Sequence, residues 1–281
     1  MRALIDGDII VFRAAFACEK RVYTLSWQSG ATARAQMFES RKALNSFVEE
    51  HGLEDYTIES VRNLEPLEFA THNMRSILHG ITDALRTDYV SVYLTGTNNF
   101  RRALTPSYKA NRDPTMRPAW FAECRNWLVG NWGAQVVDGM EADDAIGINT
   151  APDTVCVSID KDLLTIPGLH YHFVNQDQRI VTPEEAVTNF WKQMLIGDKA
   201  DNVQGIPKIG PVTANKLLQG KPEAEQYKQV RQLYRKHKLD FDLNYNLLRI
   251  LRSEAEYERV TQAVRQGQIP APDLRHLTGA V

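Results

Sequence analysis

The sequence has few features of a secreted, zinc-binding or membrane-spanning protein. Its 281 residues contain three cysteines, Cys18, Cys124 and Cys156, and no Cys-x-x-Cys pair. An odd, widely spaced set predicts neither a disulfide framework nor a zinc site, so we expect reduced thiols in or near the core. No apolar run approaches the ~20 residues that span a bilayer, and the N-terminus shows no signal-peptide pattern. We therefore expect a cytoplasmic protein with no membrane partner.

An excess of positive charge is also missing, because the formal net charge is −2. This value alone argues against a nucleic-acid ligand, but the distribution of charge matters more than the sum. Residues 205–281 contain 13 basic and 8 acidic residues, and residues 95–125 contain six basic and two acidic ones. The remainder of the chain is strongly acidic. This distribution lets two basic regions bind a polyanion while the acidic groups serve another purpose.

Short apolar stretches typical of buried strands alternate with amphipathic helical stretches. The expected strands are residues 3–6, 89–96, 134–139, 154–162 and 171–175. The expected helices are 39–52, 66–87 and 118–131, and residues 21–27 and 31–38 have the pattern of a hairpin. This alternation predicts an α/β fold with a mostly parallel central sheet flanked by helices. In such sheets the ligand site lies outside the carboxyl ends of the strands.

Three acidic clusters follow expected strands. They are Asp6 with Asp8, then Glu141 with Asp143 and Asp144, and finally Asp160 with Asp162. Each alone has a simple structural explanation, a turn or a helix cap. Together at one sheet edge they repel one another and need a shared counter-charge. Carboxylates without nearby cysteine or clustered histidine favour Mg²⁺ or Mn²⁺ over Zn²⁺, and so many of them indicate two ions, as in phosphodiester hydrolysis.

Residues 196–218, "IGDKADNVQGIPKIGPVTANKLL", contain a tight turn between Gly205 and Gly210 that leads into a helical pattern. This stretch matches a helix-hairpin-helix turn, in which backbone N–H groups and a helix N-terminus face phosphates. Lys208 and Lys216 flank the helix, and two aspartates precede the turn. The pattern predicts DNA contacts that do not read the base sequence.

These blocks resemble those of the 5′-nuclease superfamily, which includes flap endonucleases, the 5′-nuclease domain of DNA polymerase I and the 5′→3′ exonucleases of tailed phages. The matching blocks are "IDGD" at 5–8, "YKANRD" at 108–113, "MEADDAIG" at 140–147 with "SIDKDLLTIPG" at 158–168, and "GDKADNVQGIPKIGPVTA" at 197–214. The small size and the lack of a polymerase region make a phage-type exonuclease the nearest relative. The resemblance implies a PIN-like α/β core at 1–195, with a gateway segment at 97–117, and a helix-hairpin-helix and C-terminal helical region at 196–281.

The resemblance also assigns roles by position. The implied metal ligands are Asp6, Glu141, Asp143, Asp144, Asp160, Asp162, Asp198 and Asp201. Lys109 and Arg112 match gateway residues that contact the scissile phosphate, and Tyr108 matches an aromatic on which a terminal base stacks. The implied DNA contacts are Arg101, Arg102, Gly205, Lys208, Gly210 and Lys216. No protein nucleophile is required.

The implied function is a metal-dependent 5′→3′ DNA exonuclease with flap or structure-selective endonuclease activity. The implied cofactors are two Mg²⁺ or Mn²⁺ ions, with a monovalent K⁺ at the hairpin turn. The implied partner of this monomer is double-stranded DNA with a 5′ end, flap, nick or gap, or an RNA–DNA hybrid. One alternative is a PIN-like ribonuclease, but small ribonucleases of that class lack the hairpin and gateway blocks. Another is a non-catalytic branched-DNA-binding protein, against which the retained acids argue.

One position departs from the pattern of the superfamily. Many relatives carry a further metal-site aspartate after the second strand, and this sequence has Gly96 there. Either Asn98 or Asp8 substitutes for the missing carboxylate, or the second ion is held more loosely. The number of ligands is therefore left open by the sequence.

Overall fold

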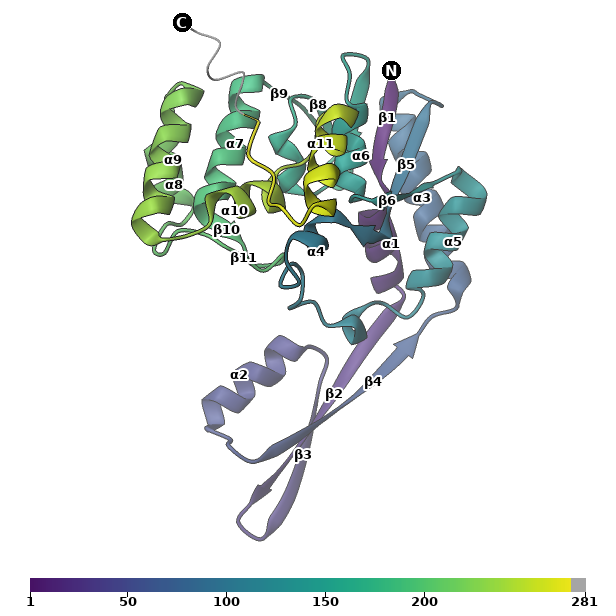
Figure 1. Cartoon of the computed structure of the whole chain (residues 1–281). Coiled ribbons are helices and arrows are strands. Elements are labelled where there is room, and N and C mark those ends of the chain that lie inside the picture. Colours follow the sequence, from purple (N-terminus) through teal and green to yellow (C-terminus); the bar gives the residue numbers. More distant parts are fainter. Residues whose placement is uncertain (274–281) are drawn as a thin grey trace, which may run out of the picture.

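The computed structural model describes residues 1–273 (Figure 1). Residues 274–281 of the predicted C-terminal region lie outside the described residues. The three cysteines are free and buried, as predicted. In the described part of the chain, every helix is too short or too polar to cross a bilayer.

The centre of the molecule is a six-stranded sheet. Its strands are, in order across the sheet, β6 (Gln135–Gly139), β5 (Val90–Asn99), β1 (Arg2–Asp6), β7 (Thr154–Val157), β8 (Gly168–His172) and β9 (Asp177–Val181). The first five are parallel, and β9 pairs with β8 in the antiparallel direction. The predicted α/β fold with a mostly parallel central sheet is confirmed.

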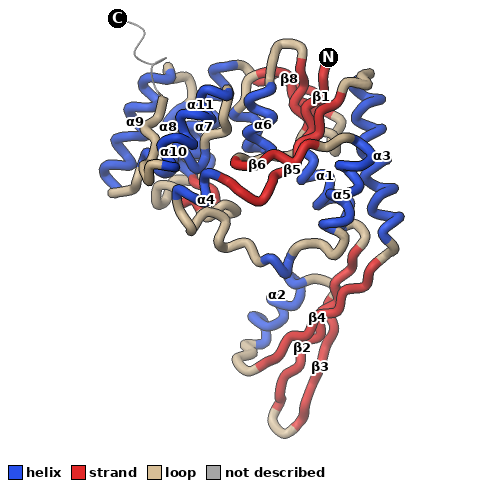
Figure 2. Tube along the Cα trace, turned by 45° about the vertical axis from the view of Figure 1, so that its right-hand side comes forward, coloured by secondary structure: helices blue, strands red, loops and turns tan. Residues whose placement is uncertain are grey.

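Helices cover both faces of this sheet because alternate residues of each strand point to opposite sides. Ile5 lies in register with Val92 and Val157, and all three face a core formed with α1 (Gly7–Phe16), α3 (Leu67–Leu85) and α5 (Phe121–Trp132). The neighbouring pair Leu4 and Cys156 faces α6 (Ala142–Asn149) and the 3₁₀ helix η2 (Lys161–Thr165). Figure 2 shows α1, α3 and α5 together on one side and α6 on the other. Burial of both faces explains the apolar strands in the sequence.

A second hydrophobic core lies beside the sheet. It is formed by α7 (Pro183–Ile196), α8 (Pro211–Leu218), α9 (Glu223–His237) and α10 (Phe241–Leu248), with the short strands β10 (Gly197–Asp198) and β11 (Val203–Gln204) between α7 and α8. Trp191 of α7 and Tyr234 of α9 are among its fully buried side chains. The last helix, α11 (Glu254–Arg265), packs against α4 (Phe100–Leu104) through Val260 and Phe100.

A third unit, which we call the arm (residues 19–64), projects away from the sheet (Figures 1 and 2). It consists of β2 (Glu19–Ser29), β3 (Thr32–Phe38), α2 (Arg41–His51) and β4 (Tyr56–Leu64). β2 pairs with both other strands in the antiparallel direction. The buried side chains of Tyr23, Leu25 and Leu44 join the sheet of the arm to α2. The predicted hairpin and the predicted helix 39–52 are both present.

Two strand predictions differ from the structure. The expected strand at 171–175 is in fact β8, which ends at His172, and residues 173–176 form a turn into β9. The expected strand at 154–162 ends at Val157, because Asp160 caps η2. β4 and β9 were not predicted, because their residues are mostly exposed and lack a buried apolar face.

Candidate nuclease site

The three acidic clusters meet at the carboxyl edge of the sheet, as the parallel arrangement requires. Asp6 ends β1, Asp160 follows β7, and Glu141 follows β6 as the N-cap of α6. Ser158, which the sequence analysis did not single out, joins two of these strands. Its hydroxyl donates to Asp6 Oδ2 over 3.0 Å and accepts from the backbone N–H of Asp160 over 3.1 Å. Its place just after a strand and two residues before Asp160 is the signal that would have found it.

Asp6, Asp143 and Asp160 form the first group of acids. Burial raises the pKa of Asp6 to about 7, and the charges of Asp8 and Asp160 add to this rise. Burial likewise raises the pKa of Asp143 well above its ordinary value, helped by the charges of Asp6 and Asp160. Closely spaced carboxylates of this kind disfavour one another's ionisation. A bound cation would relieve this repulsion.

Asp162 and Asp198 form a second group beside the first. Burial raises the pKa of Asp162 to about 7, and the charges of Asp160 and Asp198 contribute. Asp162 also shares a hydrogen bond with Asp198. Asp198 itself accepts from the backbone N–H groups of Ala200 over 2.7 Å and Asp201 over 3.1 Å, which fixes the turn between β10 and β11. The turn between β10 and β11 thus places the carboxylate of Asp198 next to Asp162 of η2.

Glu141 and Asp201 lie in a neutralised part of the site. Lys109 Nζ contacts Glu141 and lies 3.5 Å from Asp201, and Arg112 Nη2 lies 2.6 Å from Asp201. Burial raises the pKa of Glu141, but the charges of Arg101 and Lys109 outweigh it and leave this pKa below its usual value. Before any ligand binds, the predicted phosphate-contacting residues are therefore paired with two of the predicted metal ligands.

The position of Tyr108 contradicts its predicted role as a stacking platform. Its side chain is 2% exposed and belongs to the core of α7–α10. The phenol donates toward Glu141 Oε2 at 3.0 Å and Asp201 Oδ2 at 2.9 Å. A ring that is enclosed by protein has no free face for a base. Tyr108 instead orients two carboxylates.

Asp144 and Arg101 also differ from their predicted roles as metal ligand and DNA contact. They form a bidentate pair, with Arg101 Nη1 and Nη2 at 2.6 and 2.8 Å from Asp144, and both side chains are almost fully buried. Asp144 also accepts from the backbone N–H groups of Glu141 and Leu251. With its lone pairs used in this way, it fixes the start of α6. Of the two predicted α4 contacts, only Arg102 is exposed.

The structure gives a physical reason for the glycine at position 96. A Cβ there would lie 2.4 Å from the carbonyl oxygen of Val137 in β6. Both residues expected to substitute for the missing carboxylate have other partners in the structure. Asp8 pairs with Arg125 at 2.5 Å and accepts from the backbone N–H of Thr95, while Asn98 bonds to Asp138. The sequence predicts no specific role for Arg125, because its partner Asp8 is 117 residues away along the chain.

The predicted hairpin turn connects α7 to α8. Gly205 packs so closely on Ile196 that a Cβ would lie 2.0 Å from its carbonyl oxygen, which explains why a glycine stands there. Gly210 is the N-cap of α8, and the side chains of Lys208 and Lys216 are exposed. Two exposed lysines thus lie on the one segment that contains the turn and α8.

The acidic residues suit a hard divalent cation by their chemistry. Carboxylate oxygens are the ligands that Mg²⁺ prefers, and Asp6, Asp143 and Asp160 repel one another in the absence of a cation. Within residues 1–273, no three acidic, histidine or cysteine side chains are grouped tightly enough to enclose an ion as they stand. In donor type and in charge, however, these carboxylates fit a divalent cation.

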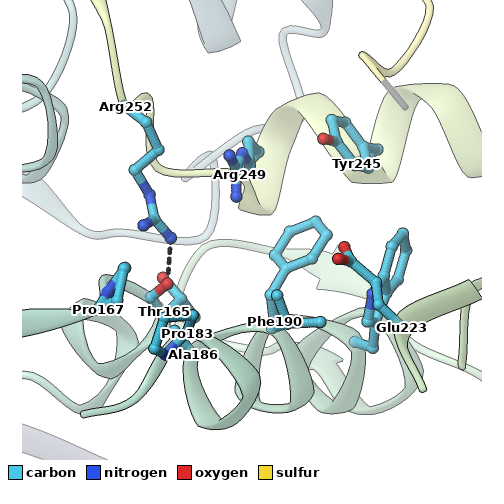
Figure 3. A pocket seen from close by; sticks show the side chains of 11 residues that line it. Thr165, Pro167, Pro183, Ala186, Phe190, Glu223, Tyr245, Arg249 and Arg252 are labelled. Carbon is cyan, nitrogen blue, oxygen red and sulfur yellow. Dashed lines mark hydrogen bonds between the residues drawn. The ribbon is translucent and has the colours of Figure 1, made fainter. Parts of the chain in front are cut away.

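A separate cavity of about 240 Å³ lies on the other side of η2 (Figure 3). Arg249, Arg252, Phe190 and Tyr245 are among the side chains that line it, and Arg252 donates to the carbonyl oxygen of Thr165 across it. None of the acids predicted to bind metal lines this cavity. This cavity is therefore separate from the acidic edge of the sheet.

Comparisons with known proteins find exonucleases and a DNA polymerase I among the relatives of this chain. No family model matches the sequence. The chain is 35% identical over 140 residues to DNA polymerase I of Rhizobium leguminosarum, a match that covers 43% of this chain and 14% of that protein. It is 26% identical over 219 residues to the exodeoxyribonuclease of Enterobacteria phage T3 (74% and 63%), and 28% identical over 166 residues to a 5′-3′ exonuclease of Buchnera aphidicola (50% and 58%). The chain thus spans less than two thirds of the length of each of these relatives.

A solved structure of the T5 D15 protein, co-crystallised with metal ions, has a similar fold. The TM-score is 0.55 at 13% sequence identity, and the match covers 94% of this chain and 98% of that one. The predicted resemblance to the superfamily is confirmed by the named relatives, and the structure of the T5 protein shows that the fold is shared.

Proposed function

We propose that this chain, whose relatives and fold are those of the 5′-nuclease superfamily, is a metal-dependent 5′→3′ DNA exonuclease that also cleaves flaps. The observation that carries the proposal is the juxtaposition of two charge groups at the carboxyl edge of the sheet. Asp6 and Asp143 repel each other there, and Lys109 and Arg112 of the gateway segment reach the same edge. This edge would thus bind cations through its carboxylates, and the neighbouring lysine and arginine would bind a phosphate.

The acids divide the proposed metal binding between two places. Asp6, Asp143 and Asp160 would hold one Mg²⁺ or Mn²⁺ ion, and Asp162 with Asp198 a second. When bound, such ions stabilise negative charge on a phosphate and lower the pKa of a water molecule. Glu141 and Asp201 are proposed to act indirectly. They would orient Lys109 and Arg112 and lie next to the bound ions.

The gateway residues are proposed to hold the phosphate. Lys109 and Arg112 now pair with Glu141 and Asp201, so an arriving phosphate would exchange for a carboxylate as their partner. Positive groups placed where charge develops in the transition state lower the barrier most. Lys109 adopts a positive φ of 55°, fixed by its backbone N–H bond to the carbonyl oxygen of Asp201. This bond fixes the backbone of Lys109, and the ion pair with Glu141 holds its ammonium group at the sheet edge.

We propose that residues 1–195 form the catalytic unit and that 196–281 contribute the duplex-binding region. Gly205, Lys208, Gly210 and Lys216 would contact the DNA backbone, with K⁺ at the turn. The gateway segment is short and holds Pro106 and Pro114, which keep it from forming one long helix. A short segment can pass a single strand but gives little cover to a long flap, which favours action at free 5′ ends.

The test uses labelled DNA and the full chain. We expect Mg²⁺-dependent release of 5′ label from linear, nicked and flapped duplex, slower loss of 3′ label, and intact covalently closed circles. EDTA should abolish cleavage. Loss of closed circles at the rate of linear duplex would show that a free end is not needed. Preferred cleavage of RNA would support the PIN-like ribonuclease, and DNA binding without cleavage in Mg²⁺ would support a non-catalytic branched-DNA-binding protein.

A further inference from the structure

The gateway segment is attached to the body of the protein on its N-terminal side. The backbone N–H of Lys109 bonds to the carbonyl oxygen of Asp201 over 3.0 Å, and Asn111 Nδ2 bonds to that of Lys199 over 2.7 Å. Asn202 returns a bond to the carbonyl oxygen of Ser107. These contacts join residues 107–112 to the loop between β10 and β11.

Residues 111–117, which we call the gateway tip, are all exposed. They contain the 3₁₀ helix η1 (Pro114–Met116), capped by Asp113. A segment with so little buried apolar surface has low local stability unless polar contacts hold it. Its order therefore depends on what it touches on its C-terminal side.

The base of the arm provides those contacts (Figures 1 and 2). Arg62 of β4 donates to the carbonyl oxygens of Arg117, at 3.2 Å, and Thr115. Arg21 of β2 lies 3.2 Å from the sulfur of Met116. Just beyond the tip, the backbone N–H of Ala119 donates to Glu19 Oε2 over 2.8 Å, and Trp120 Nε1 donates to the carbonyl oxygen of Glu65 over 2.9 Å.

The charges at the base of the arm link its stability to the gateway. Arg21 and Arg62 are directly opposite across β2 and β4, an arrangement in which like charges destabilise a sheet. Glu19 offsets one of them, at 3.0 Å from Arg21, and the gateway carbonyl oxygens accept from both. The Glu19 side chain is only 3% exposed and accepts a bond from the backbone N–H of Ala119, just after the gateway segment. Undocking of the gateway would therefore leave a buried carboxylate and two facing guanidinium groups short of partners.

We propose that the arm is a positioning element for the gateway, with Arg62 and Glu19 as its principal contacts. By fixing residues 115–119, it holds the segment that carries Lys109 and Arg112 in place before DNA binds. Held groups lose less entropy at the moment of reaction, and a displacement of about 1 Å can cost ~100-fold in rate. This inference rests on the proposed function for its effect on cleavage, but its effect on gateway order does not.

The experiment compares Arg62→Ala with Arg62→Lys and with Arg34→Ala, which removes an exposed arginine of β3 at the far part of the arm. Amide hydrogen exchange of residues 112–120 and single-turnover cleavage of 5′-labelled duplex are measured on the full chain. For Arg62→Ala we expect exchange about tenfold faster or more, a rate loss of about tenfold or more, and DNA affinity within about threefold. Arg62→Lys, which keeps one donor group, should be intermediate, and Arg34→Ala should match the wild type.

The outcomes separate this proposal from the proposed function. Unchanged exchange and cleavage in Arg62→Ala would overturn the role of the arm. Faster exchange with unchanged cleavage would show that the arm orders the gateway without positioning it for the reaction, which also overturns the proposal. If the wild type cleaves no DNA, the proposed function fails while the exchange data still test the contact. Glu19→Ala, which removes the acceptor of the Ala119 N–H, provides the same test should Arg62→Ala fail to fold.

Discussion

Arg101 and Asp144 form a bidentate ion pair under the surface of the proposed catalytic site. Arg101 also donates to the carbonyl oxygens of Leu247 and Arg249, and burial opposes the charge of its guanidinium while Asp144 more than offsets this and raises its pKa. The pair thereby joins α4, α6 and the segment before α11. It has a structural role next to residues with a proposed chemical one, and the two roles can be separated.

Adjacent carboxylates should respond oppositely to loss of charge. Asp144→Asn leaves the guanidinium of Arg101 buried without its counter-charge, which should lower the free energy of unfolding by about 3–5 kcal/mol. Asp143→Asn removes repulsion from Asp6 and Asp160 and should leave the metal-free protein equally or more stable, although activity is lost. Urea unfolding of both variants in EDTA at pH 8 measures this. Equal losses of stability would show that Asp144 has no special structural role.

Metal-free stability should depend on pH in a defined direction. Asp6 and Asp162 have a pKa near 7 in the folded chain and near 3.8 when unfolded. Between these values the folded state binds more protons, so the contribution of these groups to stability falls as pH rises from about 4 to 7. Mg²⁺ binds the ionised form and should raise Tm more at pH 8 than at pH 5.

The matched variant for this pH effect is Asp6→Asn. It should raise the metal-free Tm at pH 8 and reduce the shift caused by Mg²⁺, and it should raise the Tm less at pH 5. Thermal unfolding with and without EDTA decides the matter. A Mg²⁺ shift that is as large at pH 5 as at pH 8 would mean that the ion binds elsewhere.

Lys109 should affect rate more than affinity. Its contact is proposed to strengthen as charge develops on the phosphate, so Lys109→Met should lower the single-turnover rate by roughly 100-fold with DNA affinity within about threefold. Arg102→Met is the comparison, because this exposed residue on α4 is proposed to contact DNA without touching the acids. It should weaken binding and leave the rate at saturating DNA unchanged. A reversed pattern in the two variants would refute these assignments.

The hairpin should bind duplex without reading its sequence. Lys208→Ala and Lys216→Ala should each weaken binding about equally across sequences and reduce the salt dependence by roughly one phosphate contact. Lys42→Ala, on the exposed surface of α2, serves as the control and should behave as the wild type. Titrations at several salt concentrations with two unrelated duplexes test this, and a change in sequence preference would contradict backbone-only contact.

Gly96 should not tolerate the carboxylate that the resemblance to the superfamily leads us to expect at this position. A Cβ would collide with the carbonyl oxygen of Val137, so Gly96→Ala and Gly96→Asp should both destabilise the protein, by about 1–3 kcal/mol for alanine. Gly80→Ala in α3 has open space around it and should instead stabilise by about 0.5–1 kcal/mol. Tighter Mg²⁺ binding by Gly96→Asp without loss of stability would falsify this account of the glycine.

The general architecture could be predicted from the sequence because its signals are local. Apolar runs followed by acids mark the strands β1 and β7, and the turn from Gly205 to Gly210 marks the hairpin. Parallel strands share a carboxyl edge, so the meeting of Asp6 and Asp160 follows from topology alone. β9 escapes this kind of prediction for the opposite reason, since an exposed strand at the edge of the sheet carries little apolar pattern.

The strands of the central sheet that end in acids, and the meeting of those acids at one edge, could thus be predicted from local patterns. Which of those acids keep an uncompensated charge could be seen only in three dimensions. Asp144 is neutralised by Arg101, 43 residues away, and Tyr108 is buried against Asp201, 93 residues away. The spacing of residues along the chain carries no information about such partners, because ion pairing and burial depend on distance in space and on the exclusion of water.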